Sequence, residues 1–292
     1  MLVTLNACCR GSSHIKDGKP CQDSCESFKD SDNYLGLAIV ADGHGGEKYI
    51  RSDIGSREAV FRAKIFVHKL LRNHIDVYIK RKDKESLKKN FDLLKSQIVS
   101  EWRDAVTRHQ ADNCLTEDEK NILRCLGQTE RDFGENNPEL YGTTLLIAGY
   151  IEKYSFWFAL QIGDGKIALL KNDGSIAYPI PDLDEQGFGV TNSLCNSNAA
   201  DKIQYAYAFE RISGITVMTD GMSDSFDLEK LPKFLMDIKD NALIDVKRTQ
   251  KELVSYLPKL SEQGSGDDIS IAGVFVKENG LSVVNHTNKG CR

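Results

Sequence analysis

Residues 35–46 read Leu-Gly-Leu-Ala-Ile-Val-Ala-Asp-Gly-His-Gly-Gly, an apolar run that ends in a carboxylate and a glycine-rich turn. Such a run, bounded by turn residues, is typical of a buried β-strand. An acid at the end of a buried strand is costly unless a cation or hydrogen-bond donors face it. Asp42 is that acid, so we expect a cation beside it. The alternative is an ordinary turn capped by the Asp side chain.

The glycines of this turn widen the range of backbone conformations that it can adopt. Gly43, Gly45 and Gly46 allow conformations closed to other residues, so a main-chain carbonyl can face the same cation. His44 then lies beside the metals, where an imidazole can pass a proton to a leaving alkoxide near neutral pH. The turn therefore predicts both metal ligands and a general acid.

Acidic residues recur where other predicted strands begin or end. The apolar strand at 215–218 also leads into Asp-Gly, a carboxylate pair opens the last strand, and another acid begins an early short strand. A Gly-Asp-Gly segment at 163–165 joins two strands, where an ordinary hairpin turn is an equally good explanation. The acids are Asp23, Asp164, Asp220 with Asp224 one helical turn later, and Asp267 with Asp268.

Carboxylate and carbonyl oxygens suit hard cations such as Mg²⁺ and Mn²⁺. Two such ions about 3.5–4 Å apart can share a hydroxide, lower its pKa and stabilise charge during in-line attack on phosphorus. This chemistry needs no protein nucleophile, and the sequence contains no Gly-x-Ser-x-Gly elbow or Walker loop. The acids therefore favour metal-dependent hydrolysis of a phosphoester.

The bulk composition is that of an ordinary folded enzyme, with 40% hydrophobic and 28% charged residues. The formal net charge of −5 favours neither nucleic acid nor a membrane surface as a partner. Apolar runs are far shorter than the roughly 20 residues of a membrane-spanning helix, and the N-terminus lacks a signal-peptide pattern. We therefore expect a cytoplasmic protein, whose oligomeric state the sequence leaves open.

Eight cysteines lie at irregular spacings without a Cys-x-x-Cys pair. In a reducing compartment such residues are small buried hydrophobes more often than a disulfide framework. A zinc site built from His14, Cys21 and Cys25 is the alternative, although the sequence suggests no fourth ligand.

Strand and helix patterns come in blocks, which indicates an α+β protein with antiparallel sheets covered by helices. Residues 47–137 carry apolar steps of three and four that predict two long helices, and further helices are expected at 228–238 and 243–257. No linker divides the chain, so we expect one domain over 1–292 with a polar tail at 285–292. Strands are predicted at 3–8, 23–28, 35–40, 143–151, 155–162, 166–170, 203–209, 215–218 and 269–276.

The acidic and glycine-rich motifs form an ordered set along nearly the whole chain: Asp23, Asp42-Gly43-His44-Gly45-Gly46, Gly142-Thr143-Thr144, Gly163-Asp164, Asp220-Gly221 with Asp224, and Asp267-Asp268-Ile269-Ser270. In this order they resemble the metal-dependent protein phosphatases of the 2C type, and most of all the bacterial and divergent members of that family. The resemblance implies a four-layer αββα sandwich, with two antiparallel sheets flanked by helices and the metals in a channel at one edge.

The resemblance also implies which residues hold the metals. Asp42 would bridge two ions of Mn²⁺ or Mg²⁺, and Gly43 would lend its carbonyl. Asp220 and Asp267 would complete one metal site, while Asp23 would support the other. The implied substrate is a phosphoserine or phosphothreonine protein, so an opposing kinase is an implied partner.

Further roles follow from the same resemblance. Asp164 with Asp224 would hold a weaker third ion, and His44 would be the general acid. The arginine that normally binds phosphate shortly before the first acidic motif is missing here. His14 is the residue we favour in its place, with Arg10 or a nearby lysine as alternatives.

A second departure is Asp268, which stands where the family usually has asparagine. The two departures together leave open a phosphoprotein-binding regulatory module that keeps the fold with weak turnover. A phosphatase acting on a small phosphoester is the other alternative to a protein phosphatase.

Overall fold

Two stacked β-sheets form the centre of the computed structural model, which describes residues 1–30, 32, 34–129, 137–181, 191–227 and 229–277. Sheet A has the strand order β1-β10-β9-β6-β7, and sheet B has the order β2-β3-β4-β5-β8. Neighbouring strands are antiparallel throughout. The strands are β1 (Leu2–Cys9), β2 (Asp23–Lys29), β3 (Gly36–Asp42), β4 (Leu145–Ile151), β5 (Phe156–Ile162), β6 (Lys166–Leu170), β7 (Ile176–Ala177), β8 (Gln204–Phe209), β9 (Gly214–Met218) and β10 (Ile269–Val276).

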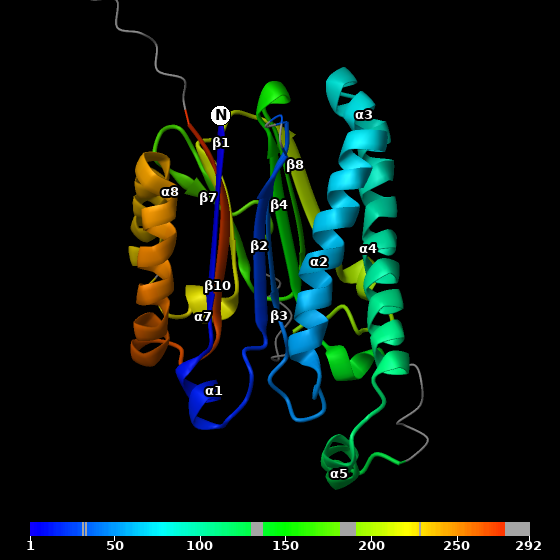
Figure 1. Cartoon of the computed structure of the whole chain (residues 1–292). Coiled ribbons are helices and arrows are strands. Elements are labelled where there is room, and N and C mark those ends of the chain that lie inside the picture. Colours follow the sequence, from blue (N-terminus) through cyan, green and yellow to red (C-terminus); the bar gives the residue numbers. More distant parts are fainter. Residues whose placement is uncertain (31, 33, 130–136, 182–190, 228, 278–292) are drawn as a thin grey trace, which may run out of the picture.

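Helices cover the outer face of each sheet (Figure 1). α2 (Ser52–Leu70) and α4 (Lys84–Asp112) pack on sheet B, and α8 (Lys230–Gln263) packs on sheet A. The predicted α+β class and the four-layer αββα sandwich are therefore confirmed. The shorter segments are α1 (Ser12–Lys16), the π-helix η1 (Leu71–Ile75), α3 (Asp76–Arg81), α5 (Glu117–Cys125), the 3₁₀ turns η2 (Pro138–Tyr141) and η3 (Glu152–Tyr154), α6 (Ala199–Lys202) and α7 (Asp220–Ser223).

Three apolar clusters fill the spaces between these four layers. One lies between sheet B and its helices, with Phe91 and Trp102 of α4 fully buried. A second lies between the two sheets, and a third lies between sheet A and α8. β4 and β5 are buried at every position because sheet B is covered on both faces. This double burial explains why these strands read as unbroken apolar runs.

The structure refines the predicted elements at a few points. The two-residue strand β7 was not predicted, because so short a pairing leaves no pattern. The helices predicted at 228–238 and 243–257 form one element, α8, whose helical geometry is interrupted at Asp245 (φ −149°, ψ 95°). Leu228 and the predicted tail at 285–292 lie outside the described residues. Among the helices that the structure describes, none is long and apolar enough to span a membrane.

Candidate metal centre

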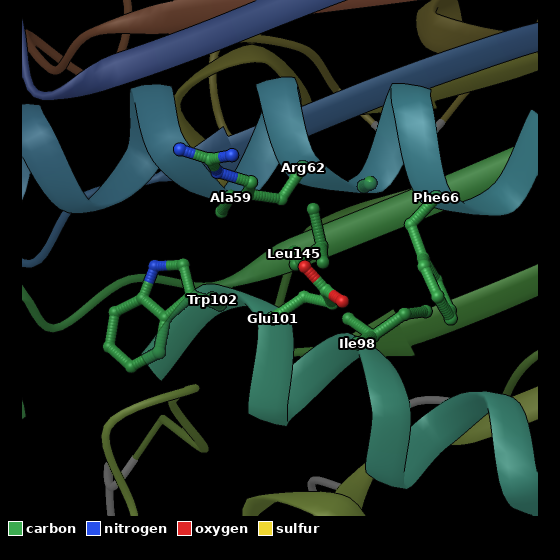
Figure 2. Close-up of a pocket in the computed structure, with 8 residues that line it drawn as sticks. Ala59, Arg62, Phe66, Ile98, Glu101, Trp102 and Leu145 are labelled. Carbon is green, nitrogen blue, oxygen red and sulfur yellow. The ribbon is translucent and has the colours of Figure 1, made fainter. Parts of the chain in front are cut away.

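The packing of α2 against α4 leaves a small pocket on the outer side of sheet B (Figure 2). Its lining includes Arg62, Phe66, Glu101 and Trp102, and none of the predicted site residues. The acids gather instead at the end of the sandwich near α1 and α7, where β3 ends and β2 begins (Figure 1).

Strand pairing places the first two acids side by side. In the antiparallel pair of β2 and β3, Asp23 lies directly opposite Asp42. The Gly-Thr-Thr segment fixes the backbone of Asp42, whose N–H donates to Thr144 Oγ1 at 2.9 Å. The Asp42 carbonyl accepts from the Thr144 N–H at 2.8 Å and from Thr143 Oγ1 at 2.9 Å. These bonds explain why two threonines follow Gly142.

The turn after Asp42 requires glycine because the backbone packs too closely for a side chain. A Cβ on Gly43 would lie 2.6 Å from the Ser52 carbonyl oxygen and 2.7 Å from that of Gln22. The Gly43 N–H donates to the Gln22 carbonyl at 3.0 Å. The Gly43 carbonyl is thus held directly after the acid, as a main-chain ligand would have to be.

The other two principal acids come from the neighbouring ends of β9 and β10. α7 begins at Asp220 directly after β9, and the Gly221 N–H donates to the Asp220 carboxylate at 2.7 Å. Burial raises the pKa of Asp42 well above its usual range, and the charges of Asp23, Asp220 and Asp267 raise it further. Burial also raises the pKa of Asp220, to which Asp164 and Asp267 add. Acids distant in sequence therefore share one electrostatic site.

Asp23 is the most enclosed acid of this group. Its Oδ2 accepts from Thr219 Oγ1 at 2.8 Å, and Thr219 Oγ1 in turn accepts from the Ser270 N–H at 3.0 Å. Its Oδ1 is buried and has no hydrogen-bond partner within the described part of the chain. Burial raises the pKa of Asp23 well above its usual range, followed by the effects of Cys8 and Asp268.

His44 lies on the turn between Gly142 and Tyr49. Its N–H donates to the Gly142 carbonyl at 3.0 Å, and its ring centroid lies 4.8 Å from that of Tyr49. Burial lowers the pKa of His44, while the nearby Asp164 carboxylate opposes that shift. Asp164 Oδ2 accepts from Thr191 Oγ1 at 2.5 Å. Asp164 is therefore close enough to the turn and to Asp220 to act on both electrostatically.

Asp224 is the predicted ligand that the structure ties least closely to the other acids. Its N–H donates to the Asp220 carbonyl at 2.7 Å, which places it one turn further along. Its carboxylate is exposed and accepts from Ser223 Oγ at 3.2 Å. The structure brings the backbone of Asp224 to the site, while burial and the charges of Asp23, Asp220 and Asp267 have the largest effects on the pKa of Asp42.

The segment before Asp23 brings basic groups to the centre. His14, on α1, has Nδ1 3.0 Å from Asp268 Oδ2 and Nε2 3.7 Å from Asp267 Oδ1. A Cβ on Gly45 would lie 4.0 Å from His14 Nε2, so the imidazole lies between the acid pair and the glycine turn. Lys19 Nζ donates to the Gly45 carbonyl at 3.0 Å. Arg10 Nη2 donates a hydrogen bond to the His14 carbonyl oxygen at 2.9 Å.

The donors of this site fit hard divalent cations. Carboxylates raise one another's pKa here, and Asp23 Oδ1 is a buried acceptor without a donor, so a cation would relieve both costs. Within the described residues, no three His, Cys, Asp or Glu side chains are close enough to hold one ion by themselves. The alternative of a zinc site built from His14, Cys21 and Cys25 is therefore not supported by the structure. Mg²⁺ commonly binds one or two carboxylates, keeping several waters, so a sparse oxygen set suits it.

The family of the chain is decided by a sequence comparison. The model of the protein phosphatase 2C family matches residues 10–257. The chain belongs to this family. Family membership places it among the protein serine/threonine phosphatases, which are metal-dependent hydrolases, as the ordered motifs predicted. A comparison with curated proteins gives no significant match.

Solved phosphatase structures share the fold at low sequence identity. The serine/threonine phosphatase PstP of Mycobacterium tuberculosis is 14% identical, with a TM-score of 0.58 over 95% of this chain and 99% of its own. PppA of Pseudomonas aeruginosa is 17% identical, with a TM-score of 0.54 over 94% and 97%. The catalytic domain of PstP in complex with two manganese ions is 15% identical, with a TM-score of 0.55 over 95% and 100%.

Sequence reasoning missed several residues that position the acids of this 2C-type phosphatase. Thr219 orients Asp23, and Gln22 ties the segment before Asp23 to the turn. Asp268 was noted only as a departure, yet its carboxylate accepts from two backbone N–H groups. The position of Thr219, directly before Asp-Gly, was the available signal, whereas the contacts of Gln22 and Asp268 span distant segments and leave no local pattern.

Proposed function

We propose that this chain hydrolyses phosphoserine and phosphothreonine in proteins at the centre formed by Asp23, Asp42, Asp220 and Asp267. The observation that carries the proposal is the convergence of these acids, from strands of both sheets, into one site where their charges raise the pKa of Asp42. Such a site has no evident use in packing, because clustered carboxylates destabilise a fold without a cation.

Two ions of Mn²⁺ or Mg²⁺ fit these oxygens, with a third as a further possibility. Asp42 would serve both principal ions, and Gly43 would lend its carbonyl. Asp220 and Asp267 would complete one of the two sites, and Asp23 would support the other. Asp164 and Asp224 would hold the weaker third ion. When bound, the cations supply Lewis acidity toward the phosphoryl group and make a water acidic enough to attack phosphorus.

The remaining groups orient the phosphoester and move a proton. Water attacks phosphorus, the bond from phosphorus to the Ser or Thr oxygen breaks, and inorganic phosphate is released. The leaving alkoxide needs one proton, which His44 donates from the glycine turn. His14, with Lys19 beside the same turn, would contact the phosphoryl oxygens in place of the missing arginine. A protein kinase that makes the phosphoprotein is the implied opposing activity.

The test is hydrolysis of p-nitrophenyl phosphate and of a phosphothreonine peptide by the full chain with and without Mn²⁺ or Mg²⁺. Metal-dependent release of phosphate from the peptide supports the proposal. If folded, metal-loaded protein is inert on both substrates, the proposal is wrong. Tight phosphopeptide binding without turnover would then favour a regulatory module. A strong preference for p-nitrophenyl phosphate and other small esters would favour a small-molecule phosphatase.

A further inference from the structure

Three cysteines lie together at the edge where the two sheets meet, directly behind the predicted ligand Asp23. Cys8 belongs to β1 of sheet A, Cys25 belongs to β2 of sheet B, and Cys21 lies in the segment leading into β2. All three are partly exposed and unbridged. Asn6 Nδ2 donates to Cys25 Sγ at 3.6 Å, and Cys25 also packs against the apolar cluster between the two sheets. The proposed chemistry of the metal centre uses none of these thiols.

Cys8 and Cys21 are the pair placed for reaction with each other. Their sulfur atoms are 3.6 Å apart, against about 2 Å in a disulfide, so each has to move by less than an ångström if the shift is shared. Cys21 lies in an irregular segment that can make this movement. Cys25, by contrast, is paired with Val40 in the sheet ladder and is less free to shift.

The same two thiols support the backbone of Asp23. The Asp23 carbonyl accepts from Cys21 Sγ at 3.7 Å and from Cys8 Sγ at 3.9 Å. A disulfide has no S–H group, so its formation removes both donors from this carbonyl. Movement of Cys21 also displaces the backbone of the next residue, Gln22. The Gln22 N–H donates to Asp268 at 2.5 Å, and its carbonyl accepts from the Gly43 N–H at 3.0 Å. Each of these hydrogen bonds helps to position the residues of the metal centre.

We propose that Cys8 and Cys21 are a reversible oxidative modification site that controls metal binding at Asp23. A peroxide is the oxidant: the sulfur of one thiol attacks peroxide oxygen, the O–O bond breaks, and a sulfenic acid and water form. The sulfur of the other thiol then attacks the sulfenic sulfur, the S–O bond breaks, and a second water leaves. Two thiols and one hydrogen peroxide give one disulfide and two waters, and a dithiol reductant reverses the change.

The effect on the centre follows from the position of the pair behind a metal ligand. Groups that orient metal ligands typically change metal affinity by about 10–100-fold when altered. Closing the bridge therefore weakens Mn²⁺ binding by about tenfold. The site itself does not depend on the proposed phosphatase activity, whereas any loss of turnover on oxidation rests on that proposed function.

The modification is tested on the full chain by mass spectrometry. Reduced protein is treated with hydrogen peroxide, remaining thiols are alkylated, and the protein is digested without reductant. Proteolytic cleavage before Asp23 separates Cys21 from Cys25, and a Cys9→Ser variant removes the neighbouring thiol that would confuse the assignment of Cys8. We expect a Cys8–Cys21 link that dithiothreitol reverses and that Cys21→Ser abolishes. A link from Cys8 to Cys25, or sulfinic acids without any link, overturns the proposal.

The coupling to the metal is tested by titration calorimetry with Mn²⁺ alone. Oxidised protein should bind Mn²⁺ about tenfold more weakly than reduced protein. Cys125→Ser, which removes an exposed cysteine far from the pair in sequence, should leave that difference intact, whereas Cys21→Ser should remove the response to peroxide. Equal Mn²⁺ affinity with a fully formed bridge overturns the coupling. Mapping and calorimetry need no turnover, so failure of the proposed phosphatase function would be seen separately.

Discussion

Replacing Asp268 by asparagine, the residue usual in the family, tests whether the stability of this fold depends on both oxygens of the buried carboxylate. Its Oδ1 accepts the Gly11 N–H at 2.5 Å, and its Oδ2 accepts the Gln22 N–H at 2.5 Å. The side chain is only 2% exposed, and both N–H donors are buried with it. Asparagine has one acceptor oxygen, so in either orientation its NH₂ group faces a backbone N–H.

The magnitude follows from that mismatch. One buried N–H loses its acceptor, which costs about 1–3 kcal/mol, and the other bond loses its charge assistance. The change also removes repulsion, because the Asp268 charge raises the pKa of Asp23. Asp267→Asn removes an equal charge from a side chain that is 48% exposed and keeps an acceptor for the Asp268 N–H. The difference between the two variants therefore reports the lost backbone hydrogen bond together with the closer contact of Asp268 to His14, at 3.0 Å against 3.7 Å for Asp267.

The assay is urea unfolding of both variants and the parent protein, with EDTA present to exclude metal. With a denaturant slope of about 3 kcal/mol per M, the Asp268→Asn midpoint should fall about 0.3–1 M below that of Asp267→Asn. Amide exchange should rise at Gly11 and Gln22, the two N–H groups concerned. Equal midpoints, or a more stable Asp268→Asn protein, would refute the role assigned to this carboxylate.

The remaining predictions concern the acids and two packed glycines. Asp42→Ala should abolish metal-dependent turnover while the circular dichroism spectrum stays unchanged, and normal turnover would exclude the proposed centre. Metal-free protein should lose stability as the pH rises above about 4, because burial and neighbouring charges raise the pKa of Asp42 in the folded state only, so the folded state binds more protons. Asp42→Asn should flatten that slope and saturating Mn²⁺ should offset it; a parallel profile in the variant would contradict the assignment. Gly43→Ala and Gly11→Ala should each destabilise the protein by about 2 kcal/mol or more in thermal unfolding, because the new Cβ would lie 2.6 Å from the Ser52 carbonyl oxygen at Gly43 and 2.4 Å from a backbone carbon of Asp267 at Gly11. Gly18→Ala is the control: it has open space around the Cβ but a positive φ of 71°, so it should cost less. Equal losses in all three variants would refute the packing argument.

Local patterns predicted antiparallel sheets covered by helices, and the family resemblance added the four-layer order. The strands β3, β4 and β5 are continuous apolar runs because sheet B is covered on both faces, and this property is visible in the sequence. α2 and α4 show their buried stripe for the same reason. β7 could not be found this way, since two residues carry no period. The start of β4 was also placed too early, because Thr143 and Thr144 look like strand residues but hold Asp42 through their hydroxyl groups.

Most of the candidate acids were found because they stand where a predicted strand begins or ends, whereas the groups that hold them were not found. Asp23 faces Asp42 through strand register within sheet B, but its carboxylate is oriented by Thr219 of the segment after β9 in sheet A. Gln22 and Asp268 likewise join sheet B to sheet A through a side chain and a backbone N–H. The proposed centre therefore lies on the seam between the two sheets, so its geometry depends on how the sheets are held together. A disulfide between Cys8 of sheet A and Cys21 beside sheet B would change the contacts that join the two sheets at Asp23. We therefore expect it to alter metal binding at Asp23.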